Sequence, residues 1–422
     1  MSDRDLDVVV FGATGVTGRR VASYLAERAA ETDLHWAAAA RDVEKAGRML
    51  AAAGASPSET IVADVSDPAS LNAMASRTRV VLDLVGPYTH YGRPVIDACV
   101  AGGAHYADLT GEIPFVRRMI DEFDGPAASA GVKIVQVCGF EALPPDLLVL
   151  LAAEAALERF GEGLAAVDLE VTTKPPAGLP RPSDGISGGT FQSITALVGD
   201  DDAARATDPA ALITDEAGAA TVRRVSPIAL VPRRGSDGAV IAPMAPAPFI
   251  NPAVIQRTAA LIAAAGGRPA QPFRYREGMV LGGGAGSLAV RWGVAGALSA
   301  TQTGLRGLAG ASPVVRRRLA GALQRIGPAS GFGPAEDRLE GWEWTMSVNA
   351  RTVSGNEINA HVNAQGHPGY LATARMLGEA GMLLAEDGAT PERAGCLTPA
   401  AALGTAHVDR FERARMRFSV DP

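Results

Sequence analysis

Hydrophobic residues near the start of the chain change their spacing at a glycine-rich turn. Residues 8–11 form a continuous run of β-branched and aromatic side chains. After the turn, apolar residues such as Val21, Tyr24 and Leu25 recur at helical spacing. This pattern predicts a buried strand, a tight turn and a helix over residues 8–25.

Continuous apolar runs alternate with helical patterns through residue 150. Further strands are predicted at residues 34–40, 61–64, 79–87 and 132–139, and helices at 94–101 and 114–123. Strands that are apolar on both faces and alternate with helices are typical of a doubly wound parallel sheet. We therefore expect an α/β protein with a Rossmann domain over residues 1–150, whose ligand lies across the carboxyl ends of the strands.

The pattern changes past residue 160. Alternating segments predict strands with one buried face at residues 167–173, 342–348 and 356–362, and a loop is expected at 174–185. Helical spacing occurs at residues 191–198, 251–265, 314–326 and 370–385. We expect an α+β substrate and dimerisation domain over residues 151–395 that contains a mixed sheet. The last residues, about 396–422, are expected to form a helix that packs back on the first domain.

Composition is consistent with two globular domains and excludes several classes of protein. The 422 residues are 47% hydrophobic and carry a net charge of −7, so no nucleic-acid partner is expected. Three widely spaced cysteines predict reduced thiols and a cytoplasmic location, and no export signal is visible. Six histidines show no metal-ligand spacing, so no metal is expected.

The turn after the first predicted strand has the glycine spacing of a dinucleotide site. Gly12 would let the chain turn, Gly15 would let the backbone approach a pyrophosphate, and Gly18 would let the helix pack closely on the strand. N–H groups at the helix start would face the phosphates, and three further residues would line them: Thr14, Val16 and Thr17. The spacing is Gly-x-x-Gly-x-x-Gly, and an ordinary strand-to-helix turn is the alternative.

The end of the second predicted strand is expected to select the cofactor. An acid there would bond the ribose 2′-hydroxyl of NAD, whereas Arg41 favours the 2′-phosphate of NADPH. The neighbouring Asp42 weakens this inference, and a solvated surface arginine is the alternative. Asp64, after the third strand, is either a contact to the adenine or a helix cap.

The segment after the fourth predicted strand would lie beside the nicotinamide. It begins with Gly86 and Pro87, and it contains three candidate proton donors or enolate-stabilising groups, Tyr88, His90 and Tyr91. A packed loop is the alternative for these side chains. The chain has no Tyr-x-x-x-Lys pair, which disfavours the mechanism of the short-chain dehydrogenases.

Two further polar turns are expected at the same edge of the sheet. Cys138 and Gly139 are expected to line the cofactor site, with Cys138 as a buried thiol rather than a nucleophile. Glu112, Glu141 and Asp146 would hold substrate or ribose, or would cap helices.

Together these motifs resemble the saccharopine dehydrogenase-like oxidoreductases, and most of all their actinobacterial trans-acting enoyl reductases. The resemblance is strong through residue 150 and from about 340 onward, and weak between about 195 and 335. It is carried by residues 12–15, 86–92, 106–112, 138–146, 187–190 and 367–370. It implies NADPH-linked reduction of the C=C bond of an α,β-unsaturated acyl or polyketide-type intermediate, either free or bound to a carrier.

Two other functions are left open by the residues. A saccharopine dehydrogenase-type C–N oxidoreductase would need basic residues to hold an amino-acid carboxylate, and only scattered arginines such as Arg181 and Arg274 are available. A non-catalytic NADP-binding scaffold would use the apolar residues 278–300 and the basic residues 316–318 for peripheral contact with the inner face of a membrane. The alternative for residues 278–300 is a loop and a buried helix, and a homodimer is also open.

Overall fold

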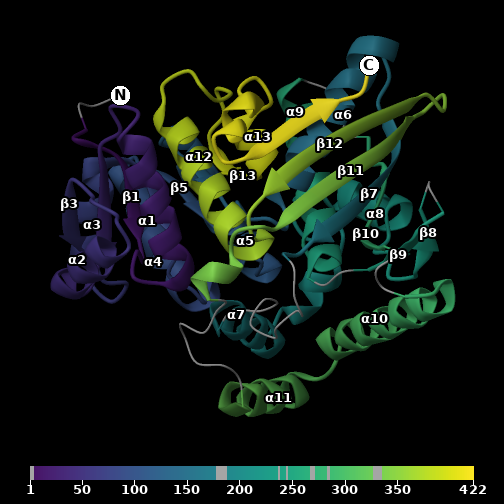
Figure 1. Ribbon diagram of the computed structural model, residues 1–422, viewed down its shortest axis with the longest axis horizontal. Coiled ribbons are helices and arrows are strands. Elements are labelled where there is room, and N and C mark those ends of the chain that lie inside the picture. Colours follow the sequence, from purple (N-terminus) through teal and green to yellow (C-terminus); the bar gives the residue numbers. More distant parts are fainter. Residues whose placement is uncertain are drawn as a thin grey trace.

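A computed structural model of the protein describes residues 4–176, 188–235, 238–243, 246–266, 271–282, 286–326 and 335–422. Within these ranges the chain forms two sheets that lie side by side, with helices packed around and between them (Figure 1). The segment 177–187, which includes Arg181 and most of the expected loop at 174–185, lies outside the described residues.

The first sheet, sheet A, is parallel throughout and has seven strands among the described residues. Its order is β13-β6-β5-β4-β1-β2-β3. The strands are β1 (Leu6–Phe11), β2 (Trp36–Ala40), β3 (Glu59–Val62), β4 (Thr78–Asp83), β5 (His105–Asp108), β6 (Lys133–Val135) and β13 (Gly395–Leu397). This arrangement confirms the expected doubly wound parallel sheet.

The direction of winding changes between β1 and β4. From β1 the chain proceeds outward to β2 and β3, then returns to place β4 on the other side of β1. Ligands of open α/β sheets bind at such a switch point. The helices of this half are α1 (Val16–Ala29), α2 (Val43–Ala52), α3 (Pro68–Arg77), α4 (Tyr88–Gly102) and α5 (Ile113–Ser129). The loops that start α1 and α4 therefore meet at this point.

The second sheet, sheet B, is mixed and also has seven strands within the described ranges. Its order is β14-β12-β11-β7-β10-β9-β8, and β7 and β10 are its parallel pair. The strands are β7 (Leu164–Lys174), β8 (Arg233–Arg234), β9 (Val240–Ala242), β10 (Arg274–Leu281), β11 (Glu343–Thr352), β12 (Glu357–Gln365) and β14 (Met416–Val420). Buried positions alternate along β11 and β12, as expected for a sheet with one face on the core.

Helix α6 (Leu143–Phe160) connects the two sheets. It follows sheet A in the chain and packs against β7, β11 and β12 of sheet B. Most of its residues are buried, because it has protein on several sides. One continuous hydrophobic core therefore runs from Val8 and Leu82 in sheet A to Val348 and Val362 in sheet B.

The C-terminal residues do not form the expected single helix. Residues 395–397 instead pair with β6, α13 (Pro399–Leu403) is short, and residues 416–420 pair with β12. The expected contact with the first sheet exists, but through strand β13. Helix α12 (Thr373–Ala385) also packs on sheet A, against α1, β1 and β4. The domain boundaries at residues 150 and 395 stay predictions.

The remaining helices are α7 (Gly188–Gly199), α8 (Glu216–Val225), α9 (Asn251–Ala265), α10 (Leu288–Ala309) and α11 (Pro313–Ile326). Helices α10 and α11 extend along one side of the molecule, away from sheet A (Figure 1). Leu288, Val290 and Val294 of α10 are exposed, so the alternative of a buried helix is wrong.

Candidate active site

The glycine turn after β1 has the geometry that the sequence predicts. Gly12 has a φ of +86°, and a Cβ atom there would lie 3.0 Å from the backbone carbon of Leu84. A Cβ atom on Gly18 would overlap the carbonyl oxygen of Gly12. A side chain at Gly12 would therefore collide with the segment after β4, and one at Gly18 would push α1 away from the turn, so glycine is required at both positions.

The start of α1 is suited to an anion. Gly15 is exposed at the N-cap, no side chain caps the helix, and its first turn contains no acid. The N–H groups of this turn and the positive end of the helix dipole are therefore available to a phosphate. Thr14, Val16 and Thr17 are half-buried around the loop.

Arg41 is exposed directly after β2. The carboxylate of Asp42 accepts a hydrogen bond from Lys45 N at 2.9 Å and caps α2, so Arg41 is the side chain at the strand end that is available to a ligand. Asp64 Oδ1 accepts hydrogen bonds from the backbone N and the hydroxyl of Ser66, which hold the pKa of Asp64 below its usual range. Because Asp67 caps α3, the interpretation of Asp64 as the helix cap is wrong.

Tyr88, one of the three predicted proton donors, is buried. Its hydroxyl donates to Asp83 O at 3.1 Å and accepts from Leu109 N at 3.3 Å. Burial, followed by the charges of Asp108 and Asp83, raises the pKa of Tyr88 well above its usual range. These contacts disfavour Tyr88 as a proton donor to substrate, because the hydroxyl binds backbone groups inside the protein.

His90 and Tyr91 are exposed on the first turn of α4, with ring centroids 6.1 Å apart. Gly86 is exposed and Pro87 half-buried just before this turn. A Cβ atom on Gly86 would lie 3.9 Å from the hydroxyl of Ser193, so α7 passes over this segment. The segment therefore lies at the switch point, and α7 covers it.

Two buried acids lie at the ends of β4 and β5. The hydroxyl of Tyr106 is 3.1 Å from Asp83 Oδ2 and 2.9 Å from Asp108 Oδ2. A tyrosine hydroxyl has one proton, so it donates a hydrogen bond to one carboxyl group and can only accept one from the other. Burial raises the pKa of Asp108 to about 6 and that of Asp83 well above its usual range. Both carboxyl groups are therefore protonated more readily than an exposed aspartate.

The three acids expected to hold substrate or cap helices divide between these roles. Glu112 accepts hydrogen bonds from the backbone N atoms of Tyr88 (3.1 Å) and Thr89 (2.7 Å) and so caps α4. Asp146 accepts from Ala400 N at 2.8 Å, at the start of α13. Glu141 alone lines a cleft.

Cys138 and Gly139, expected to line the cofactor site, are both buried. Burial raises the pKa of the Cys138 thiol well above its usual range, so Cys138 is a structural thiol and not a nucleophile. A Cβ atom on Gly139 would lie 3.4 Å from Leu109 Cδ2 and 3.6 Å from Glu141 Oε2. The backbone after β6 thus passes close to the acid that lines the cleft.

This cleft lies between the carboxyl end of sheet A and one face of sheet B, and the sequence analysis did not identify it. It contains about 720 Å³ of empty space, counting the part open to solvent. Its walls are mainly apolar, with four polar side chains, and the lining residues are Phe140, Glu141, Pro145, Val171, Pro246, Ala247, Asn251, Glu277, Trp342, Met346, His367, Pro368 and Gly369. An apolar pocket with a few convergent polar groups is typical of a small-molecule site.

Glu277, on β10, is the most deeply buried acid of the cleft, with 6% of its surface exposed. Its Oε2 accepts hydrogen bonds from Asn251 Nδ2 at 2.7 Å and from the hydroxyl of Tyr275 at 3.1 Å. Burial raises the pKa of Glu277 to about 7. Strand β10 was not predicted, because its start is charged and a glycine-rich stretch follows it. The signal was the spacing of Tyr275 and Glu277, which share one face of a strand.

Comparison with known proteins identifies the family. A Mycobacterium tuberculosis protein named as a candidate trans-acting enoyl reductase is 36% identical over 429 residues, covering 97% of this chain and 96% of its own length. A trans-acting enoyl reductase of Mycobacterium bovis is 34% identical over 420 residues, with the same coverage. The chain belongs to the trans-acting enoyl reductase family.

This family member carries a saccharopine dehydrogenase NADP-binding domain, which matches residues 8–135. The enzyme is an NADPH-dependent oxidoreductase, which confirms the predicted cofactor and the predicted class of protein. The open, uncapped start of α1 and the exposed Arg41 fit the pyrophosphate and the 2′-phosphate of that cofactor. The roles of individual residues toward NADPH stay predictions.

A solved structure has a fold similar to that of this reductase family member. Saccharopine dehydrogenase (L-Glu forming) from Saccharomyces cerevisiae superposes with a TM-score of 0.51 at 12% identity, covering 99% of this chain and all of the yeast chain. At this identity the likeness shows the fold alone. It agrees with a Rossmann sheet followed by a second, mixed sheet.

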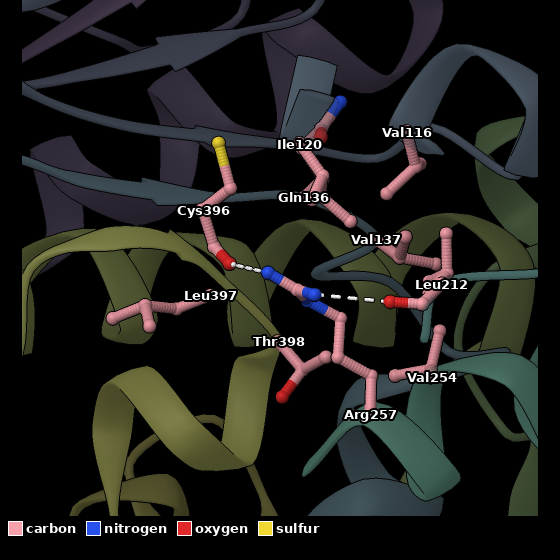
Figure 2. A pocket seen from close by; sticks show the side chains of 10 residues that line it. All are labelled: Val116, Ile120, Gln136, Val137, Leu212, Val254, Arg257, Cys396, Leu397 and Thr398. Atoms are coloured by element: carbon pink, nitrogen blue, oxygen red, sulfur yellow. Dashed lines mark hydrogen bonds between the residues drawn. The ribbon is translucent and has the colours of Figure 1, made fainter. Parts of the chain in front are cut away.

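A second pocket, drawn in Figure 2, contains a buried arginine that fixes helix α9 of the reductase. Arg257 is 4% exposed, and it donates to Leu212 O at 3.0 Å and to Cys396 O at 2.8 Å (Figure 2). These bonds tie α9 to β13 of sheet A. Because Asn251 is the first residue of α9, Arg257 also fixes the position from which Asn251 reaches Glu277.

Across the described ranges, no helix is both long and apolar enough to cross a membrane. Over the same residues, no three histidine, cysteine, aspartate or glutamate side chains gather as metal ligands would.

Proposed function

We propose that the enzyme reduces the carbon–carbon double bond of an α,β-unsaturated acyl substrate with NADPH. The names of its relatives support this reaction. The observation that carries the proposal is the lining of the cleft, which is mainly apolar and, among the described residues, includes neither lysine nor arginine. Such a lining suits an uncharged acyl chain.

The same lining disfavours the saccharopine dehydrogenase type of reaction. An amino-acid adduct brings carboxylates, which are held by cations in buried sites. This cleft instead presents two acids, Glu141 and Glu277, and both have a pKa raised by burial. Arg274, one of the two arginines considered for a carboxylate clamp, is not among the lining residues.

The bound cofactor supplies a hydride to the β-carbon of the substrate. The chain has three tasks beside this: to hold NADPH with the loop at Gly12, Gly15 and Gly18, to bind the acyl chain away from water, and to provide a proton. His90 and Tyr91 are proposed to lie near the nicotinamide and to stabilise charge on the carbonyl oxygen.

The test is consumption of NADPH by the purified protein with 2-enoyl thioesters of increasing chain length. We expect NADPH oxidation with stoichiometric saturated product, and none with pairs of an amino acid and a keto acid. The reverse preference would favour the C–N oxidoreductase. Binding of NADPH with no turnover of either class would favour the non-catalytic scaffold.

Peripheral membrane contact through α10 is a second proposal, favoured by one specific observation. Val290, Val294 and Leu305 are exposed on one face of a helix with no acidic residue. Amphipathic surfaces of this kind bind anionic lipid. Flotation of the protein with phosphatidylglycerol vesicles is expected, and flotation that persists after replacement of all three residues by serine would contradict the proposal.

A further inference from the structure

The two carboxyl oxygens of Glu277 have different environments. Oε2 accepts two hydrogen bonds, from Asn251 Nδ2 and Tyr275 Oη. Oε1 is buried and has no hydrogen-bond partner among the described residues. A neutral carboxyl group has one acceptor oxygen and one O–H group, and the contacts of Oε2 and Oε1 are compatible with that form. A proton on Oε1 would therefore have no acceptor until a ligand enters the cleft.

The charges around Glu277 are few. Burial raises the pKa of Glu277 to about 7, and Asn251, Tyr275 and the more distant Arg233 partly oppose that rise. Arg233 of β8 donates to the backbone oxygen of Glu277 at 3.4 Å, not to the carboxyl group. Glu141 and His367 also line the cleft, and Asp146 acts on Tyr275 from α6. The protonated form is therefore well populated near neutral pH.

We propose that Glu277 is the proton donor of the reduction, with Asn251 and Tyr275 as the residues that position its carboxyl group. This inference rests on the proposed function, because it needs an unsaturated acyl group in the cleft. The proposed proton donor therefore lies on sheet B. The sequence alone predicts a donor in residues 88–91, beside the nicotinamide.

The reaction balances with this one acid. The β-carbon takes up the hydride of the reduced nicotinamide, and the electron pair of the C=C bond moves to the α-carbon and the carbonyl. That pair forms the new α-carbon–hydrogen bond with the proton of Glu277, which is left as the carboxylate. Asn251 and Tyr275 then stabilise the carboxylate through Oε2 until it takes a proton from water after the product leaves.

Glu141 and His367 are the other groups in the cleft that can carry a proton. The ring of His367 lies between the rings of Trp342 and Tyr370, with centroids 4.6 and 4.8 Å away. Glu141 follows β6 in the chain and also lines the cleft. Glu277 is the group whose orientation the structure fixes, because Asn251 and Tyr275 both donate to its Oε2.

The first test compares Glu277→Gln with the wild type and with Glu343→Gln, an exposed glutamate at the start of β11. We expect kcat of Glu277→Gln to fall about a hundredfold or more, with KM and NADPH affinity nearly unchanged. Glu343→Gln should match the wild type. Unchanged NADPH affinity shows that the Glu277 variant is folded. A kcat within about threefold of wild type would overturn the inference while leaving the proposed function intact.

The second test does not depend on turnover. Infrared difference spectra of the protein without NADPH, taken as wild type minus Glu277→Gln to remove the other buried acids, should show a protonated-carboxyl band that titrates near pH 7 and shifts when a saturated acyl thioester binds. Tyr275→Phe removes a donor to the carboxylate, so it should move this titration, and the high-pH limit of kcat, to higher pH. A spectrum unchanged by Glu277→Gln would overturn the inference. If the band is present but the protein turns over no enoyl thioester, the proposed function is rejected instead.

Discussion

Asn251 Nδ2 lies 2.7 Å from Glu277 Oε2, although the residues are 26 positions apart in the chain. The bond joins the start of α9 to β10 inside the cleft between the two sheets. It also leaves Asn251 Oδ1 buried without a partner among the described residues. Two unpaired buried oxygens that belong to one hydrogen-bonded pair suggest a site that is completed by a ligand.

Glu277 should give the protein a distinctive dependence of stability on pH. Its pKa is about 7 when folded and 4.5 ordinarily, so the folded state keeps a proton that the unfolded state loses. The contribution of Glu277 to the free energy of unfolding is fully present below about pH 4.5. It is lost as pH rises through 7, and the total loss is roughly 3 kcal/mol. Urea unfolding at about pH 5 and about pH 8 should therefore show a smaller decrease in Glu277→Gln than in the wild type. Equal decreases in the free energy of unfolding of the two proteins would show that Glu277 is not the cause of the pH dependence.

Gly18→Ala should weaken NADPH binding at least about tenfold, or about 1.4 kcal/mol. The added Cβ atom would overlap Gly12 O and displace α1 from the turn. Gly47→Ala is the matched control, since a Cβ atom on this α2 residue would have nothing within 4 Å. Fluorescence titration with NADPH measures both, and equal affinities for the two variants would contradict the assigned role of Gly18.

Arg41→Ala should reduce the preference for NADPH over NADH by about tenfold. The reason is the loss of the cation available to the 2′-phosphate, because Asp42 is engaged in capping α2. Arg48→Ala serves as the control, since Arg48 is exposed on the same helix. The ratio of the two dissociation constants is measured for each variant. A ratio in Arg41→Ala equal to that of the wild type would assign Arg41 to the solvated surface.

Glu379→Ala should destabilise the protein by about 3–5 kcal/mol. Glu379 is fully buried on α12 and accepts hydrogen bonds from Tyr24 Oη at 2.6 Å and Arg28 Nε at 2.8 Å, so its loss leaves the buried Arg28 with only the exposed carboxylate of Glu31. Glu44→Ala, which breaks an exposed pair with Arg48, should cost no more than about 0.5 kcal/mol. Chemical denaturation measures both free energies of unfolding, and similar values would contradict the account of α12 as part of the first sheet's packing.

Most of sheet A could be predicted from the sequence, because its first four strands and β6 lie in local apolar runs. The same local signals located the turn at Gly12 and Gly18. In contrast, β13 has three residues and forms only because β6 lies beside it, and so no local pattern indicates it. Asp146 caps α13, and this contact is equally non-local because Asp146 and Ala400 are 254 residues apart in the chain.

The cleft could not be predicted for the same reason. Glu277 lies on a strand that begins with charged residues, and Asn251 starts a helix, where a polar side chain is ordinarily a cap. Only the fold, which places the first residue of α9 beside β10, brings them together. His367 and Gly369 belong to a motif that the resemblance includes, but their place in the cleft depends on the fold.

Hydride transfer from NADPH to the β-carbon of an unsaturated acyl group can be followed by isotope labelling. The experiment uses NADPH labelled with deuterium at the transferred position of C4, a 2-enoyl thioester in ordinary water, and mass spectrometry of the product. We expect a saturated thioester with one deuterium at the β-carbon and an unlabelled hydrogen at the α-carbon. Recovery of the unsaturated thioester with the label still on NADPH, from protein that binds NADPH, would contradict this expectation.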